Sequence, residues 1–141
     1  MNDNLRSAQQ QLLQEIDGSI SDKSILKVLS KVPRQMFVPR KYYYSAYENV
    51  PLPIGDDQTI SQPLIVCIMI ELLELKYTDK VLDIGSGSGY QTAFLAELSS
   101  KVVGVERIKR LVDSSKRCMS KLGYKNVEIY QAQEELGYPE L

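Results

Sequence analysis

The sequence predicts an α/β fold in which N-terminal helices precede a parallel β-sheet, and two observations carry this prediction. Apolar residues recur at helical spacing over residues 4–16 and 21–32, whereas short apolar strands alternate with helices after Lys80. Strands that alternate with helices favour a parallel sheet with right-handed crossovers. We therefore expect a helical region over residues 1–75 and a sheet region over residues 76–141, joined in one continuous domain.

The N-terminal elements follow from apolar spacing and from proline positions. Ser21 is the expected N-cap of the second helix, which Pro33 ends. The tyrosine-rich residues 42–47 have two open interpretations: a helix that packs its rings on a core, or a substrate-facing segment. Residues 50–62 are rich in Pro, Gly, Asp and Thr, which indicates an ordered loop or a short strand pair. A helix over residues 63–75 is expected next, because proline is tolerated in a first turn.

The sheet region has a regular order of elements. The apolar runs and turn residues predict, in order, a strand at 81–84, a glycine-rich turn at 85–89, a helix at 90–98, a strand at 101–105, a helix at 108–122 and a strand at 127–130. Gly123 is the expected residue just past the last helix, where a left-handed backbone conformation is common.

Composition indicates a globular protein and excludes several function classes. The chain has 141 residues, 43% hydrophobic and 25% charged, with a formal net charge of −1. This balance gives no electrostatic argument for nucleic acid or an anionic membrane, and the longest apolar run, residues 64–70, is far shorter than the ~20 residues of a membrane span.

Histidine and cysteine usage narrows the chemistry. The chain contains no histidine, which excludes an imidazole base and a zinc site with histidine ligands, and we predict no metal. Cys67 and Cys118 lie far apart in the sequence without CxxC spacing. This spacing argues against a disulfide framework and favours a reducing, cytoplasmic setting.

The glycine-rich turn is the strongest chemical signal. Gly85, Gly87 and Gly89 lie between a strand and a helix, where they permit a tight turn and the close approach of a ligand. A G-x-G-x-x-G dinucleotide fingerprint would need a sixth residue of glycine, but Tyr90 occupies that position. Because the helix that follows offers free N–H groups, an anionic group is expected at this turn.

Two carboxylates complete the pattern. Asp83 lies two residues before the first glycine, and Glu106 ends the next strand, where a carboxylate can accept hydrogen bonds from a ribose diol. The combination predicts a Rossmann-like site for S-adenosylmethionine. We expect the methionine end to lie against residues 85–89, including Ser86, with Asp83 near its ammonium and Glu106 on the ribose. A different nucleotide-binding α/β domain, or a tight turn with no ligand, is the alternative.

Several blocks of the sequence resemble one family, the protein-L-isoaspartate (D-aspartate) O-methyltransferases. They occur in order and cover residues 24–140. The blocks are Val32-Pro33-Arg34-x-x-Phe37-Val38-Pro39, Ala46-Tyr47, Leu52-Pro53-Ile54-Gly55, Gln58-Thr59-Ile60-Ser61-Gln62-Pro63, residues 81–90 and Glu106-Arg107-Ile108. The block from Gln58 to Pro63 is the most specific, because other methyltransferases lack it. The resemblance implies a class I methyltransferase fold of which this chain holds the N-terminal helices and a partial sheet.

The resemblance also implies an activity and a substrate. The family transfers a methyl group from S-adenosylmethionine to the free carboxylate of isoaspartyl residues in damaged proteins, which allows their repair. The acceptor carboxylate is already ionised at neutral pH, so no general base is needed. By resemblance, residues 50–62 form a substrate-side loop in which Ser61 is the first and Thr59 the second choice for positioning that carboxylate. The alternative role for both hydroxyls is to cap the helix that begins near Pro63.

The sequence departs from the family in two places. After the last strand, the family's Gly-Asp-Gly is replaced by Ala132-Gln133-Glu134, so that the adenine amino group would meet the Gln133 amide and cofactor affinity would fall. The sequence also supplies three strands where the family fold has seven. We therefore expect the first strand to have an open edge, through which the chain could self-associate or bind a complementing chain.

Two alternatives to an active isoaspartyl methyltransferase stay open at this point. One is an inactive, truncated remnant or half-protein, which binds the cofactor weakly or acts only with a complementing chain. The other is a methyltransferase for a small molecule or RNA, which the Gln58–Pro63 block and the absence of a basic surplus disfavour.

Overall fold

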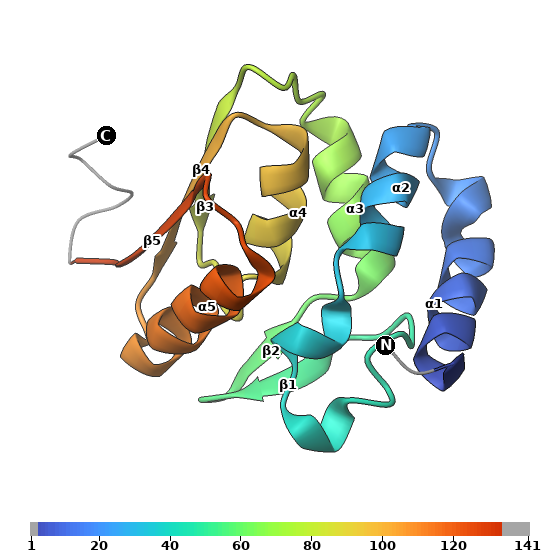
Figure 1. Cartoon of the computed structure of the whole chain (residues 1–141), viewed down its shortest axis with the longest axis horizontal. Coiled ribbons are helices and arrows are strands. Elements are labelled where there is room, and N and C mark those ends of the chain that lie inside the picture. The colour runs from blue at the N-terminus through green and yellow to red at the C-terminus, as the bar shows by residue number, and fades with distance from the viewer. Residues whose placement is uncertain (1–2, 134–141) are drawn as a thin grey trace. The chain divides into compact units, whose positions relative to one another are not determined.

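The computed structural model describes residues 3–133 of the chain (Figure 1). The chain divides between Glu74 and Leu75 into two compact units. In the described residues, the first unit holds helices and a two-stranded hairpin, and the second holds a three-stranded parallel sheet with two helices.

The first unit is built on three α-helices that share one apolar core. Its elements are α1 (Asp3–Ile16), η1 (Asp17–Ser19), α2 (Lys23–Lys31), η2 (Arg34–Phe37), η3 (Arg40–Tyr42), β1 (Leu52–Gly55), β2 (Gln58–Ile60) and α3 (Pro63–Leu72). In α1 and α2 the buried apolar side chains follow the predicted spacing, among them Leu5, Leu12, Ile16, Ile25 and Leu29, and α3 buries Val66 and Ile70. No helix among residues 3–133 is long and apolar enough to cross a bilayer.

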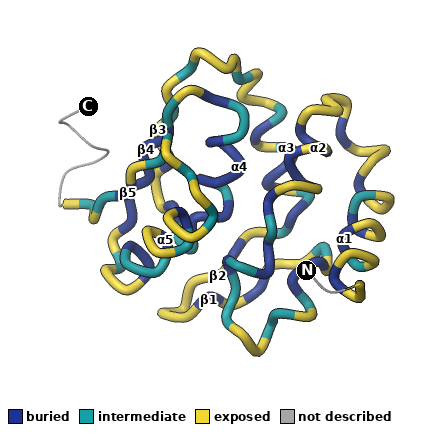
Figure 2. The backbone as a smooth tube through the Cα atoms, viewed as in Figure 1, coloured by how far each residue is buried: buried dark blue, intermediate teal, exposed yellow. Residues whose placement is uncertain are grey.

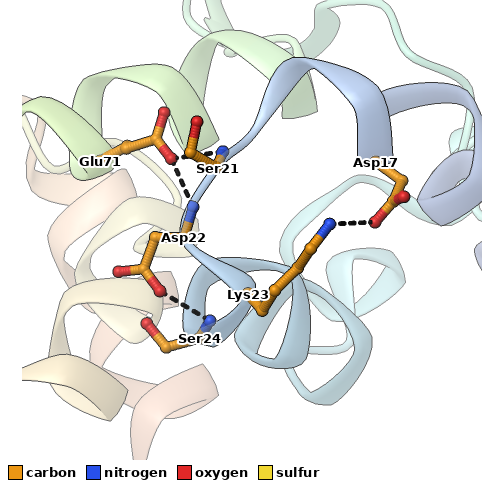
Figure 3. Close-up of polar contacts among 6 residues, drawn as sticks. All are labelled: Asp17, Ser21, Asp22, Lys23, Ser24 and Glu71. Atoms are coloured by element: carbon orange, nitrogen blue, oxygen red, sulfur yellow. Dashed lines mark hydrogen bonds and ion pairs between the residues drawn. The ribbon is translucent and has the colours of Figure 1, made fainter.

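The start of α2 differs from the prediction. The N-cap is Asp22, not Ser21, because the Asp22 carboxylate accepts a 2.8 Å hydrogen bond from the backbone N–H of Ser24 (Figure 3). The N–H groups of Ser21 and Asp22 both donate to Glu71 on α3 at 2.7 Å. A carboxylate from a distant helix therefore satisfies the backbone that leads into α2.

The tyrosine-rich segment is not a regular helix. It forms the short η3 turn after Pro39 and continues as turns, so its rings have different environments. Tyr47 is buried and donates a 2.5 Å hydrogen bond to the side chain of Gln35, whereas Tyr44 is 71% exposed. Burial raises the pKa of the Tyr47 hydroxyl to about 12. Tyr47 thus belongs to the core whereas Tyr44 does not, so neither of the two interpretations describes the whole segment.

Of the two alternatives for residues 50–62, the structure has the short strand pair, and the predicted third helix is present with shorter bounds. β1 and β2 pair antiparallel, with Leu52 opposite Ile60 and Pro53 opposite Thr59. α3 ends at Leu72 rather than at residue 75, because Leu73 is its C-cap and Glu74 has a left-handed backbone with a φ of 48°.

The second unit confirms the predicted parallel sheet. Its elements are β3 (Lys80–Ile84), α4 (Tyr90–Leu98), β4 (Lys101–Glu106), α5 (Lys109–Leu122) and β5 (Val127–Gln131). The strand order is β3-β4-β5 and both pairings are parallel. Gly123 ends α5 with a φ of 80°, as expected for a left-handed C-cap. Because the strands are parallel and in register, β3 and β4 end at the same edge of the sheet.

β3 has an open edge, as the sequence predicted. Among the described residues it pairs with β4 alone, and its side chains Leu82 and Ile84 are 40% and 65% exposed. By contrast, the central strand β4 is buried along its length from Val102 to Glu106 (Figure 2). Within residues 3–133, one side of the β3 backbone thus has no partner strand, and such an edge can pair with a further strand.

Candidate functional site

The glycine-rich turn connects the end of β3 to the start of α4. Gly85, Gly87 and Gly89 have φ angles of 78°, 55° and 89°, a left-handed range that side chains with a Cβ rarely adopt. The N–H groups of Gly85 and Ser86 donate to the carbonyl of Val105 at 2.8 and 3.0 Å. These bonds fix the turn, hereafter the cofactor loop (residues 85–89), against the end of β4.

One side of the cofactor loop is open to a ligand. A Cβ built on Gly85 would meet no atom within 4 Å. The last residue of the loop, Gly89, is the N-cap of α4, and as a glycine it has no side chain to accept the first N–H groups of the helix. The loop therefore combines an accessible backbone with the positive end of a helix, an arrangement that suits an anionic group.

Glu106 joins the loop to the end of β4. Its carboxylate is 7% exposed, and one oxygen accepts the N–H of Gly87 at 2.9 Å while the other accepts the N–H of Ile108 at 2.9 Å. A carboxylate oxygen can accept more than one hydrogen bond. Glu106 thus holds the loop and keeps acceptor capacity for the two hydroxyls of a ribose.

Asp83 is a buried carboxylate on β3, two residues before the loop. Its oxygens accept hydrogen bonds from the Thr92 hydroxyl at 2.6 Å and from the Gln91 amide at 3.2 Å. Burial raises the pKa of Asp83 above its ordinary value, the two hydrogen bonds oppose this rise, and the nearby charge of Glu106 adds to it. Thr92 and Gln91 were not identified from the sequence, since a polar residue in the first turn of a helix carries no specific signal.

We expect Asp83→Asn to flatten the pH dependence of stability. The folded-state pKa is raised, so the folded protein binds more protons than the unfolded chain. The contribution of Asp83 to stability is therefore full below the unfolded pKa of about 3.9 and is lost as the pH rises through the folded value. The uncharged variant should lose less stability between pH 4 and pH 8, measured as the free energy of unfolding in urea.

Asp113→Asn is the matched control, because the neighbouring Lys109 lowers the pKa of this exposed carboxyl. The Asp113 variant should change the pH profile in the opposite direction, and only slightly. An Asp83 variant whose stability falls with pH as steeply as that of the unmodified chain would contradict the burial argument.

Gly104, in the middle of β4, allows the cofactor loop to approach the sheet. A Cβ at this position would lie 3.1 Å from the Cβ and 3.2 Å from the hydroxyl of Ser86, which is itself buried. Gly104 was not identified from the sequence, although a glycine inside a strand is a signal for the close approach of another backbone.

We expect Gly104→Ala to weaken cofactor binding about tenfold, because the added methyl group must displace Ser86 and with it the loop. Calorimetric titration with S-adenosylmethionine measures this change. Gly18→Ala is the control, since a Cβ on Gly18 meets nothing within 4 Å and should leave affinity unchanged. Equal affinity in both variants would show that the loop tolerates the displacement.

Ser61 and Thr59 belong to the first unit, whereas the residues above belong to the second. Thr59 is exposed on β2, and Ser61 is exposed between β2 and α3. The alternative role as a helix cap is wrong for Ser61, because the N-cap of α3 is Gln62, and the side chain that accepts an N–H in the first turn of this helix is that of Asn49. Both hydroxyls therefore stay candidates for contact with an acceptor.

Gln133 lies two residues beyond β5 and is exposed. The chain reaches it from the sheet edge that carries Glu106, because the N–H of Ala132 donates to the Glu106 carbonyl at 2.9 Å. The structure thus brings Asp83, the cofactor loop, Glu106 and the segment before Gln133 to one edge of one sheet.

Comparisons with known proteins show the family to which this chain belongs. The family model for Protein-L-isoaspartate(D-aspartate) O-methyltransferase matches residues 7–141. A protein-L-isoaspartate O-methyltransferase from Dictyoglomus thermophilum is 49% identical over 88% of this chain and 56% of its own length. One from Syntrophus aciditrophicus is 45% identical over 94% of this chain and 63% of its own length. The chain spans little more than half the length of these relatives.

Solved structures show the same fold. A protein-L-isoaspartate O-methyltransferase structure superimposes with a TM-score of 0.84 at 29% identity, covering 94% of this chain and 44% of the other. A Plasmodium falciparum structure in complex with S-adenosyl-L-homocysteine, named for the same activity, gives a TM-score of 0.74 at 27% identity over 92% of this chain and 63% of the other. The fold is that of the class I methyltransferases, and this chain belongs to the protein-L-isoaspartate(D-aspartate) O-methyltransferase family.

Proposed function

We propose that this chain transfers the methyl group of S-adenosylmethionine to the free carboxylate of L-isoaspartyl or D-aspartyl residues in damaged proteins. The observation that carries the proposal is the cofactor loop, open at Gly85 and bound through Gly87 to the buried carboxylate of Glu106. The residues that suit the cofactor are those that the sequence predicted for it.

The described residues suit the parts of the cofactor one by one. S-adenosylmethionine, when bound, supplies a methyl group that its sulfonium activates for transfer. The cofactor loop and the start of α4 suit the carboxylate of the methionine end, and Asp83 suits its ammonium. Glu106 has acceptor capacity for the ribose hydroxyls, and the Gln133 amide offers an acceptor for the adenine amino group.

The chain's own task toward the acceptor is to hold its carboxylate in place. An aspartyl-type carboxylate is ionised at neutral pH, so no side chain needs to remove a proton. Correct orientation alone can contribute several kcal/mol to such a transfer. In our proposal the exposed hydroxyl of Ser61, with Thr59 as a second donor, orients the acceptor oxygen without neutralising its charge.

The test of this function is transfer of a labelled methyl group to a peptide that contains one isoaspartyl residue, with the matched aspartyl peptide as control. Transfer to the isoaspartyl peptide alone supports the proposal. If the folded chain transfers to neither peptide, or to both equally, the proposed specificity is wrong for this chain.

The open edge of β3 supports a second element of the proposal, that a further strand from another chain completes the sheet. The candidates are a second copy of this chain and a complementing chain with the portion of the family fold that the described residues lack. Leu82 and Ile84 would become buried in either case. Sedimentation over a range of concentrations, with transfer measured in parallel, distinguishes them. A fully active monomer would disprove the need for an added strand.

A further inference from the structure

Arg34 is the most deeply buried charged side chain in the described residues, with an exposed fraction of 0%. It lies at the start of η2, and its guanidinium bonds to four backbone carbonyls. One terminal nitrogen donates to Ala46 at 2.6 Å and to Glu48 at 3.3 Å, and the other donates to Val50 at 3.0 Å and to Ser61 at 2.9 Å.

These four carbonyls lie on both sides of the β1–β2 hairpin. Residues 46–50 lead into the hairpin, and Ser61 is the first residue after it. Arg34 therefore ties the two ends of the hairpin together with one planar group. A guanidinium can do this because its donors point outward in fixed directions, whereas a lysine ammonium presents its three protons at one point.

Ser61 lies between two elements and belongs to neither of them. The ladder of β2 ends at Ile60, and α3 is capped at Gln62. Asn49 supports the next turn, since its side-chain oxygen accepts the N–H of Leu64 at 3.1 Å. The carbonyl of Ser61 is thus held by Arg34 while its hydroxyl stays exposed.

We infer that Arg34 is a positioning residue for methyl transfer, which holds the main chain of Ser61 so that its hydroxyl meets the acceptor carboxylate. This inference rests on the proposed function. It predicts that loss of the four guanidinium hydrogen bonds loosens residues 58–62 and slows methyl transfer to the peptide acceptor. Cofactor binding, which involves the second unit, should be unaffected.

The test compares Arg34→Lys with Arg40→Lys, an exposed arginine in the same unit. Hydrogen exchange followed by mass spectrometry reports on residues 58–62, with α2 as an internal reference. In Arg34→Lys we expect exchange over 58–62 at least about tenfold faster while α2 is unchanged, and kcat for the isoaspartyl peptide about tenfold lower. The dissociation constant of S-adenosylmethionine should stay within about twofold, and Arg40→Lys should match the unmodified chain in every measurement.

Three outcomes overturn the inference: unchanged exchange over 58–62, equally faster exchange throughout the chain, or faster local exchange with unchanged kcat. If the unmodified chain transfers no methyl group, the proposed function fails, and the exchange data still decide whether Arg34 holds Ser61. Should Arg34→Lys not fold, NMR of the unmodified chain replaces it. Slow exchange of the Arg34 guanidinium protons would support the four hydrogen bonds to backbone carbonyls, and rapid exchange would refute them.

Discussion

Replacement of Glu106 by glutamine is expected to weaken S-adenosylmethionine binding about 100-fold. The carboxylate already accepts the N–H groups of Gly87 and Ile108, one on each oxygen. In the glutamine variant one of these oxygens becomes an NH₂ group, which is a hydrogen-bond donor and would face a backbone N–H. One of the two hydrogen bonds, to the cofactor loop or to the residues after β4, is then lost. Hydrogen bonds to a charged acceptor contribute about 1.5–3 kcal/mol each, and a loss of about 3 kcal/mol corresponds to about 100-fold in affinity.

Calorimetric titration measures this loss, with Glu128→Gln as the control. Glu128 is an exposed glutamate on the neighbouring strand β5, where it pairs with Lys101 at 2.8 Å. Its variant should bind the cofactor within about twofold of the unmodified chain, because exposed ion pairs contribute little. A Glu106→Gln variant with normal affinity would remove this carboxylate from the site.

A modified ligand separates the two roles of Glu106. S-adenosylhomocysteine that lacks the ribose 2′-hydroxyl should bind the unmodified chain more weakly than the complete ligand. The Glu106 variant should distinguish the two ligands much less, because the partner of that hydroxyl is already gone. If the variant distinguishes them as well as the unmodified chain does, Glu106 acts only on the loop.

The cofactor side of the site could be predicted from the sequence because its signals are local. The glycines of the loop follow a strand directly, and the parallel strand order places the end of β4 beside the end of β3. Their positions in the sequence therefore predicted that Asp83 and Glu106 lie at the same edge of the sheet. The support for Asp83 from Thr92 was not predictable, since it depends on how α4 rotates over the sheet.

The first unit was less predictable because its important contacts are long-range. The hydrogen bonds of Arg34 link residues that are 12 to 27 positions apart, and no period in the sequence encodes them. Glu71 likewise satisfies Ser21 and Asp22 from about fifty residues away. A sequence pattern indicates a helix start or a loop, whereas the distant group that holds it becomes visible only in the folded chain.

Replacement of Ser61 by alanine is expected to lower kcat for an isoaspartyl peptide up to about 100-fold and to leave the fold intact. The hydroxyl is exposed and does not cap α3, so its removal costs the structure little. The variant lacks the hydrogen bond to the acceptor carboxylate, and one such bond contributes about 1.5–3 kcal/mol. Single-turnover transfer from a saturating concentration of labelled S-adenosylmethionine isolates this step from cofactor binding.

Two further variants make the Ser61 result specific. Ser21→Ala removes another exposed hydroxyl of the first unit, whose backbone rather than side chain bonds to Glu71, and it should be fully active. Thr59→Val keeps the β-branched shape on β2 while it removes a hydroxyl, so a smaller loss would rank Thr59 as the second donor. Normal transfer by Ser61→Ala would exclude the Ser61 hydroxyl, and a larger loss in Thr59→Val would reverse the order of the two residues. Because Arg34 holds the Ser61 carbonyl and not its hydroxyl, a loss in Ser61→Ala with normal exchange over residues 58–62 would assign the defect to the hydroxyl itself.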